Sequence, residues 1–118
     1  MSDYLQGTSL KQIKNFAMVN EIIDIGHEVF NPYRLVILYG LYTTKFQSFQ
    51  SLKELTKIKS DGNLASHLKV LENQKLIQYH QLFAGRRPLA FYDLTDDGKE
   101  KFEQILTSLA KFLAWTNK

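Results

Sequence analysis

The 118-residue sequence contains no cysteine, only two prolines and no long hydrophobic run. Without cysteine, disulfide bonds, thiol redox chemistry and cysteine-ligated metal sites are excluded, and a reducing cytosol is the expected compartment. The most apolar stretch, residues 35–42, is far too short to span a bilayer. The N-terminus lacks a basic segment followed by an apolar one, which argues against a secretory signal. We therefore expect a cytoplasmic chain that makes no membrane contact.

The composition is that of an ordinary globular domain, with 44% hydrophobic and 23% charged residues. A chain of this length can form one domain with its own core. His27, His67 and His80 fall in separate predicted elements, and no nucleophile motif, phosphate-binding loop or metal-ligand spacing is present. The sequence therefore predicts neither an enzyme nor a metal or cofactor site.

Positive charge is unevenly distributed along a chain whose net charge is +3. Residues 45–88 contain eight basic and three acidic residues, a balance of +5, whereas the remainder contains seven basic and nine acidic residues, a balance of −2. Clustered lysine and arginine attract polyanions through long-range steering and phosphate contacts. A solvated, lysine-rich surface is the alternative interpretation.

Two helices are predicted in the first third of the chain. Apolar residues recur at three- and four-residue steps over residues 9–30, and Gly26 weakens this helix near its end. Asn31 and Pro32 then suit an N-cap and a first helical position. The following helix, from Pro32 to about Thr44, is apolar on nearly every face, which predicts a buried central helix.

A short helix and a longer one follow across a tight connection. The capping-box spacing of Ser51 and Glu54 predicts the start of the short helix, over residues 51–57, within a residue or two. Ser60 is the expected N-cap of the longer helix, over residues 61–75. The expected inward side chains are Leu52, Leu55 and Ile58 on the first helix and Leu64, Leu68 and Leu71, helped by Ala65 and Val70, on the second.

The outer face of the longer helix carries small and polar residues: Gly62, Asn63, Ser66, His67 and Lys69. Such residues allow close approach to a groove and offer amide, hydroxyl and imidazole groups to base edges and phosphates. An ordinary polar surface is the alternative.

Two strands are predicted over residues 76–83 and 89–94. The connection between them holds Gly85, which suits an unusual backbone angle, followed by Arg86 and Arg87. An arginine-tipped hairpin can reach along a phosphate backbone or into a minor groove, although paired arginines in a turn often serve solubility alone.

The last predicted helix, residues 96–118, is capped by Thr95 and carries Asp96 and Asp97 in its first turn. Its apolar stripe is wider than a chain of this size can bury against its own core. We therefore expect this helix and the N-terminal one to form a homodimer interface; packing on its own domain is the alternative. The predicted interface residues are Leu10, Ile13, Phe102, Ile105, Leu106, Leu109, Phe112 and Leu113.

The order helix, turn, helix and basic-tipped hairpin predicts a winged helix-turn-helix, a mainly helical α+β fold with a two-stranded wing and long terminal helices. We expect one domain over residues 1–118. It divides into an N-terminal dimerisation helix (9–30), a winged helix-turn-helix core (31–95) and a C-terminal dimerisation helix (96–118).

Residues 31–102 resemble the winged-helix transcriptional regulators of the broad MarR and ArsR superfamily, especially compact one-domain archaeal and bacterial members. The resemblance covers about 70 of the 118 residues, and the ordered set of motifs is more specific than any one piece. The matching motifs are Pro32-Tyr-Arg-Leu-Val-Ile-Leu38, Phe49 with Leu52 and Leu55, Ser60-Asp-Gly-Asn-Leu-Ala-Ser-His-Leu68, Leu71-Glu72, Leu76-Ile77, Gly85-Arg-Arg-Pro88 and Leu94-Thr-Asp-Asp-Gly98.

This resemblance implies a dimeric DNA-binding regulator. The helix after Ser60 would enter the major groove, and the hairpin tip would lie over the flanking minor groove or backbone. ArsR-type metal sensors use cysteines or clustered histidines and carboxylates, which this sequence lacks. Many MarR-like proteins hold a small-molecule effector at the dimer junction, but no residue pattern here identifies such a pocket.

We predict a sequence-specific transcriptional regulator that binds double-stranded DNA as a homodimer, most simply a repressor that occupies an operator. Two recognition helices related by a two-fold axis would read half-sites roughly 34 Å apart. The predicted DNA contacts are Lys53, Lys57, Lys59, Ser60, Asn63, Ser66, His67, Lys69, Arg86 and Arg87.

Two other functions fit the same sequence. One is a protein-interaction winged helix, in which exposed aromatics such as Phe112 and Trp115 bind a partner. The other is a non-specific architectural DNA-binding protein. RNA binding is a weaker variant: Tyr79, Phe83, Phe91 and Tyr92 could stack on bases, but their alternation fits core packing better.

Overall fold

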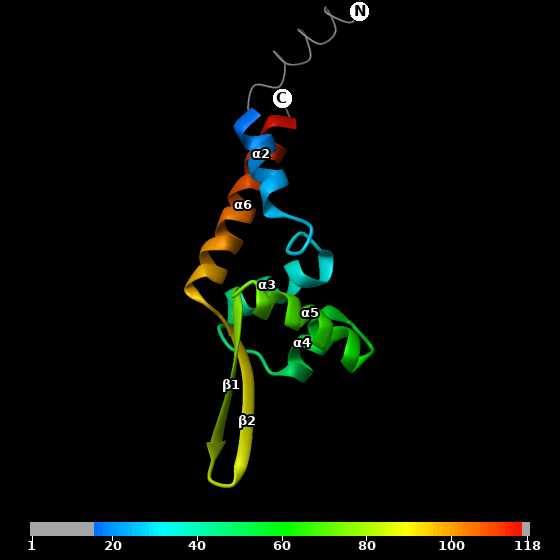
Figure 1. Ribbon diagram of the computed structural model, residues 1–118, viewed down its shortest axis with the longest axis vertical. Coiled ribbons are helices and arrows are strands. Elements are labelled where there is room, and N and C mark those ends of the chain that lie inside the picture. Colours follow the sequence, from blue (N-terminus) through cyan, green and yellow to red (C-terminus); the bar gives the residue numbers. More distant parts are fainter. Residues whose placement is uncertain (1–15, 117–118) are drawn as a thin grey trace, which may run out of the picture.

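The computed structural model describes residues 16–116 (Figure 1). The described part is mainly helical with one two-stranded antiparallel hairpin, as the sequence predicts. Its elements in chain order are α2 (Phe16–Ile25), α3 (Pro32–Thr44), α4 (Phe49–Thr56), α5 (Asp61–Asn73), β1 (Ile77–Ala84), β2 (Arg87–Leu94) and α6 (Asp96–Thr116).

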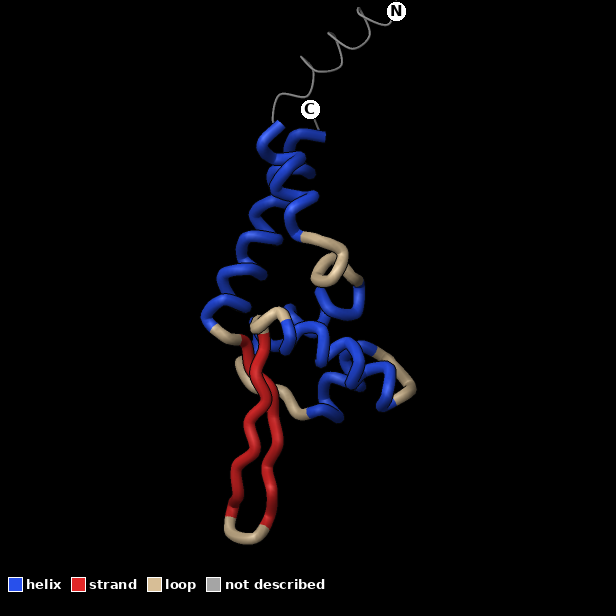
Figure 2. Tube along the Cα trace, viewed as in Figure 1, coloured by secondary structure: helices blue, strands red, loops and turns tan. Residues whose placement is uncertain are grey.

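The molecule has three parts along its long axis (Figures 1 and 2). Helices α2 and α6 pack side by side and form what we call the stalk. Helices α3, α4 and α5 form the body below it, and the β1–β2 hairpin projects from the body away from the stalk. The hairpin and the stalk therefore lie at opposite ends of the described chain.

The hydrophobic core sits where the body meets the first turns of α6. Its buried side chains come from the end of α2 and the loop after it, α3, α4, α5, the start of β1 and α6, so that elements distant in the sequence share one apolar interior. The largest fully buried apolar side chains are Ile37, Leu38, Leu41, Leu52, Leu64, Leu68, Leu71 and Ile105. The predicted inward stripe of α5 is thereby confirmed at its three leucines.

Helix α3 was predicted to be buried on nearly every face, and this is wrong. Ile37, Leu38 and Leu41 are buried, but Val36 remains exposed and Tyr39 keeps 55% of its surface accessible. The elements that pack on α3, namely α4, α5, α6 and β2, leave this side uncovered. Apolar character all around a helix thus does not guarantee that every side has a neighbour to pack against.

The helix that precedes α3 ends earlier than predicted. The described helix α2 stops at Ile25 rather than near Phe30, because Gly26 adopts a φ of +81°, a left-handed conformation that glycine enters without steric cost. Asn31 then caps α3 as predicted, since its Oδ1 accepts hydrogen bonds from the backbone N–H groups of Tyr33 and Arg34 at 3.0 and 3.2 Å. Residues 9–15 of the predicted helix lie outside the described range.

Helix α4 begins two residues before the predicted position. Its N-cap is Ser48, whose Oγ accepts a hydrogen bond from the backbone N–H of Ser51 at 3.0 Å, so Ser51 is not the cap. Leu52 and Ile58 are buried as predicted, but Leu55 is exposed. On α5, Ala65 is likewise exposed rather than inward.

The hairpin is longer and its turn tighter than the sequence suggested. Strand pairing runs from Ile77–Leu94 to Ala84–Arg87, which leaves a turn of only Gly85 and Arg86. Gly85 has a φ of +67°, and two-residue hairpin turns require such positive angles. Arg87 and Pro88, predicted to lie in the connection, therefore belong to β2.

The base of the hairpin is anchored and its outer part is not. Two backbone hydrogen bonds, at 3.1 and 2.8 Å, join Gln47 to Tyr92 on β2. Tyr92 and Leu94 also pack against the core. Residues 81–90 are all exposed, which contradicts the expectation that Phe83 packs in the core.

Helix α6 begins as predicted and then runs out along the stalk. Thr95 caps it, because its Oγ1 accepts from the backbone N–H of Gly98 at 2.9 Å and donates to the carbonyl of Lys75 at 2.7 Å. Ser108 is buried between α6 and α2, and its hydroxyl donates a hydrogen bond to Glu21 Oε2 at 3.2 Å.

Within residues 16–116, no helix combines the length and apolar character that a membrane crossing needs.

Candidate nucleic-acid interface

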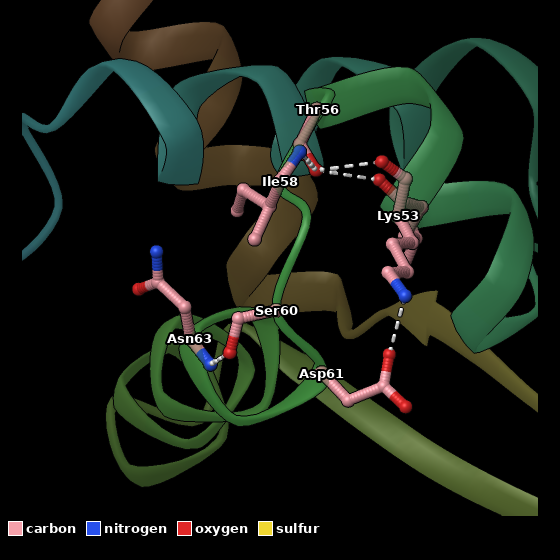
Figure 3. Close-up of polar contacts among 7 residues, drawn as sticks. Lys53, Thr56, Ile58, Ser60, Asp61 and Asn63 are labelled. Atoms are coloured by element: carbon pink, nitrogen blue, oxygen red, sulfur yellow. Dashed lines mark hydrogen bonds and ion pairs between the residues drawn. The ribbon is translucent and has the colours of Figure 1, made fainter.

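One face of α5 is free for a ligand. Its buried leucines turn the opposite face outward, and Gly62, Asn63, Ser66 and Lys69 are exposed there. Ser60 caps the helix as predicted, with its Oγ accepting from the backbone N–H of Asn63 at 3.2 Å, and the Asn63 amide group points away from the helix (Figure 3). These side chains can donate and accept hydrogen bonds at base edges.

His67 is placed differently from the other predicted contacts. It is half-buried, its Nδ1 accepts a hydrogen bond from Arg34 Nε at 3.2 Å, and its ring centroid lies 5.3 Å from that of Tyr33. Burial, and secondarily the Arg34 charge, lowers the pKa of His67 below its ordinary value of 6.5. His67 is therefore neutral at pH 7, with the proton on Nε2, and it links α5 to α3.

The turn between α4 and α5 concentrates the predicted lysines. Lys57 and Lys59 are exposed, and Lys57 ends α4 in a left-handed conformation. Lys53 is instead held by an ion pair, with its Nζ 2.7 Å from Asp61 Oδ1 in the first turn of α5 (Figure 3). The buried Thr56 shapes the turn, because its hydroxyl donates to the Leu52 carbonyl at 2.8 Å and accepts from the Ile58 N–H at 3.4 Å.

The comparisons with known proteins agree with this arrangement. A family model described as a winged helix DNA-binding domain matches residues 33–113. The chain belongs to the winged helix DNA-binding domain family. The winged helix-turn-helix that the sequence predicts is thereby confirmed. From here on we call α5 the recognition helix and the β1–β2 hairpin the wing, which are the usual names for these elements of the fold.

Several solved structures share this fold. A transcriptional regulator homologue from Pyrococcus horikoshii OT3 is 28% identical with a TM-score of 0.77, and the match covers 87% of this chain and all of that one. YusO from Bacillus subtilis is 20% identical, with a TM-score of 0.67 over 97% of this chain and 82% of its own. NadR, in complex with 4-hydroxyphenylacetate, is 20% identical, with a TM-score of 0.63 over 91% of this chain and 74% of its own. Curated proteins provide no match.

The wing places its two arginines at neighbouring but distinct positions. Arg86 is the second residue of the turn, and Arg87 is the first residue of β2, paired with Ala84. Both are exposed. They lie at the end of the hairpin farthest from the stalk (Figure 1). The exposed cations are therefore Arg86 and Arg87 on the wing and Lys57, Lys59 and Lys69 on or beside the recognition helix.

Two residues that belong to this surface escaped the sequence analysis. Asn73 is exposed at the end of the recognition helix, four residues after Lys69, and that helical spacing could have identified it. Arg34 supports the recognition helix from α3, but its partner His67 lies 33 residues away, so no local pattern could have revealed the contact.

The predicted dimer residues divide into three groups. Leu10 and Ile13 lie outside the described residues. Phe102 and Ile105 belong to the core of the chain itself, so they are not surface positions, and Leu109 is partly buried against that core. Leu106, Phe112 and Leu113 remain exposed along α6.

For residues 16–116, no group of three or more potential histidine, cysteine or carboxylate metal ligands occurs.

Proposed function

We propose that this winged-helix protein is a sequence-specific transcriptional regulator that binds double-stranded DNA as a homodimer and represses by occupying an operator. The observation that carries the proposal is the exposed polar face of the recognition helix, flanked by Lys57, Lys59 and an arginine-tipped wing. A major groove accommodates an α-helix, and the flanking cations can position it through phosphate contacts.

The stalk supports the dimeric part of the proposal. Leu106 and Phe112 on α6, and Ile23 on α2, are large apolar side chains that stay exposed although α2 and α6 already pack on each other. Apolar residues gathered along two adjacent helices suit a symmetric contact with a second copy. A dimer would place two recognition helices on one face of a duplex, and its bulk on a promoter would exclude polymerase.

DNA binding is tested by selecting duplexes from a random-sequence library with the wild-type protein and then measuring binding at several salt concentrations. We expect two chains per duplex and a steep loss of affinity with salt. Replacing Arg86 and Arg87 together with alanine should weaken binding to every duplex and lower the salt slope by about two. Asn63→Ala and Ser66→Ala should instead change which duplexes are selected.

The matched control replaces Lys99 and Lys101 of α6 with alanine. This variant loses the same two positive charges from the first turns of α6, outside both the recognition helix and the turn of the wing, so its binding should stay close to that of the wild type. Failure of the wild type to enrich any duplex would refute DNA recognition. Enrichment without any sequence preference would favour the architectural alternative.

The assembly is tested by light scattering at low concentration. We expect a dimer for the wild type and a folded monomer for Leu106→Glu, because a charge in an apolar interface would remain unpaired. A wild-type monomer would contradict the dimer and favour the protein-interaction alternative.

A small-molecule effector is also part of the proposal, because the similar structure of NadR holds 4-hydroxyphenylacetate. A rise in the melting temperature of this protein when small aromatic acids are added would support an effector site.

A further inference from the structure

The outer half of the wing exposes an unusual set of apolar side chains. Phe83 keeps 68% of its surface accessible, Leu82 55% and Leu89 45%. Pro88 is exposed as well. Single exposed apolar residues are common on proteins, but four of them within eight residues give the tip of this projecting hairpin an apolar character on both faces.

The strand register divides these side chains between the two faces of the hairpin. Phe83 pairs with Pro88 and Leu82 pairs with Leu89, and successive residues of a strand point to opposite faces. Because Ala84 and Arg87 close the two-residue turn as a hydrogen-bonded pair, Phe83 and Pro88 form the next, non-hydrogen-bonded pair, in which side chains lie closest. Proline is tolerated there because the position requires no N–H donor.

The charge of the same segment indicates what covers this tip. Residues 81–90 contain two arginines and no acidic residue. The one acidic residue of the two strands, Asp93, lies toward the base of the wing, where its Oδ1 is 2.9 Å from His80 Nε2. An apolar tip that carries only positive charge fits a polyanion with apolar walls, and the minor groove of DNA, lined by sugars and phosphates, has this character.

We propose that the Phe83–Pro88 pair is an apolar wedge that enters the minor groove beside the operator and bends the duplex, while Arg86 and Arg87 hold the flanking phosphates. This inference rests on the proposed DNA-binding function and adds a specific action of the wing. Apolar side chains inserted between base steps partly unstack them and kink the duplex by about 20–90°. The eight-residue strands span roughly 26 Å, which is long enough to carry the pair well beyond the body.

The test uses a duplex selected by the wild-type protein, with fluorophores at its two ends and 2-aminopurine at positions flanking the major-groove site. For the wild type, we expect the end-to-end distance to shorten and the 2-aminopurine emission to rise as neighbouring bases unstack. Phe83→Ala should bind about tenfold more weakly and leave the duplex straight, with an unchanged salt slope. Phe83→Trp should restore the bend.

Two variants separate the wedge from other effects. Tyr39→Ala removes an exposed aromatic side chain from α3, at the body, and should leave both affinity and bend unchanged. Arg86→Ala should lower the salt slope by about one. Because Phe83 makes no contact with the core, the melting temperature of Phe83→Ala should equal that of the wild type, so a lost bend will not reflect unfolding.

Four outcomes would overturn the inference. Equal binding and bending by wild type and Phe83→Ala would remove the wedge and leave the proposed regulator standing, whereas no wild-type binding to any duplex would remove both. A change of oligomeric state in Phe83→Ala would show that a second copy covers the tip. Binding to anionic phospholipid vesicles that depends on Phe83, without duplex bending, would point to a membrane surface instead.

Discussion

Arg34 on α3 donates a hydrogen bond from Nε to Nδ1 of His67 on the recognition helix, across 3.2 Å. The same guanidinium donates from Nη1 to the carbonyl of Glu28 at 2.6 Å, and the Glu28 carboxylate accepts from Gln74, just after the recognition helix. The loop after α2 is therefore joined to both α3 and α5. Through these contacts, the position of the recognition helix depends on α3 and on the loop between α2 and α3.

Replacing Arg34 with methionine should lower the free energy of unfolding by about 1–3 kcal/mol, because it removes two hydrogen bonds from a charged donor and leaves acceptors without their partner. Sequence-selective binding should weaken more than non-specific binding, since the recognition helix loses a support. Urea unfolding and duplex titration measure the two effects. Arg86→Met, which changes an exposed arginine at the wing tip, is the stability control and should unfold at the wild-type urea concentration.

The stability of the protein should fall with acid partly through His67. Its folded-state pKa lies below the unfolded value of about 6.5, so the unfolded chain binds the proton more readily. The stability contributed by neutral His67 is present above pH 6.5 and is lost as the pH falls below it. His67→Asn keeps an acceptor for Arg34 and does not titrate, so its melting temperature should drop less than that of the wild type between pH 7 and 5. Parallel melting-temperature curves for the two proteins would contradict this.

Gly98 and Gly62 should respond oppositely to alanine. A Cβ at Gly98 would overlap the Leu76 carbonyl oxygen and lie 2.8 Å from its carbon, so Gly98→Ala should destabilise the protein by about 3 kcal/mol. At Gly62 the nearest atom is Ser60 Oγ at 3.7 Å, so alanine should stabilise the recognition helix by about 0.5–1 kcal/mol. Because Gly62 faces outward, the added methyl should nevertheless weaken duplex binding. Stronger binding by Gly62→Ala would show that this face does not enter a groove.

Asp61→Asn should strengthen DNA binding. The substitution releases Lys53 from its ion pair and leaves another cation beside the recognition helix for a phosphate, so the salt slope should steepen by about one. Stability should change by less than about 1 kcal/mol, because the Asp61 side chain is 73% exposed and water screens the pair. Asp97→Asn makes the same charge change at the start of α6 and should leave the salt slope as it is. An unchanged slope for Asp61→Asn would mean that Lys53 contacts no phosphate.

Features that depend on neighbouring residues were predictable. Helix α3 was predicted with its observed bounds, because the Asn31 cap and Pro32 act within one turn of chain. The caps Ser60 and Thr95 were found for the same reason. At α4 the spacing of Ser51 and Glu54 placed the start two residues too late. The observed helix is capped by Ser48, and its first residue, Phe49, packs against the core, which the local spacing does not show.

The sequence by itself determined the order of elements, the inward leucines of the recognition helix and the concentration of positive charge around it, because periodicity, capping and charge are local properties of the chain. Tertiary structure decided the rest. It buried Phe102 and Ile105 in the core rather than on a surface, turned His67 toward Arg34, and left Phe83 exposed beyond the anchored base of the wing. Each of these outcomes depends on which distant segment lies opposite a side chain, and apolarity or polarity alone does not specify that partner.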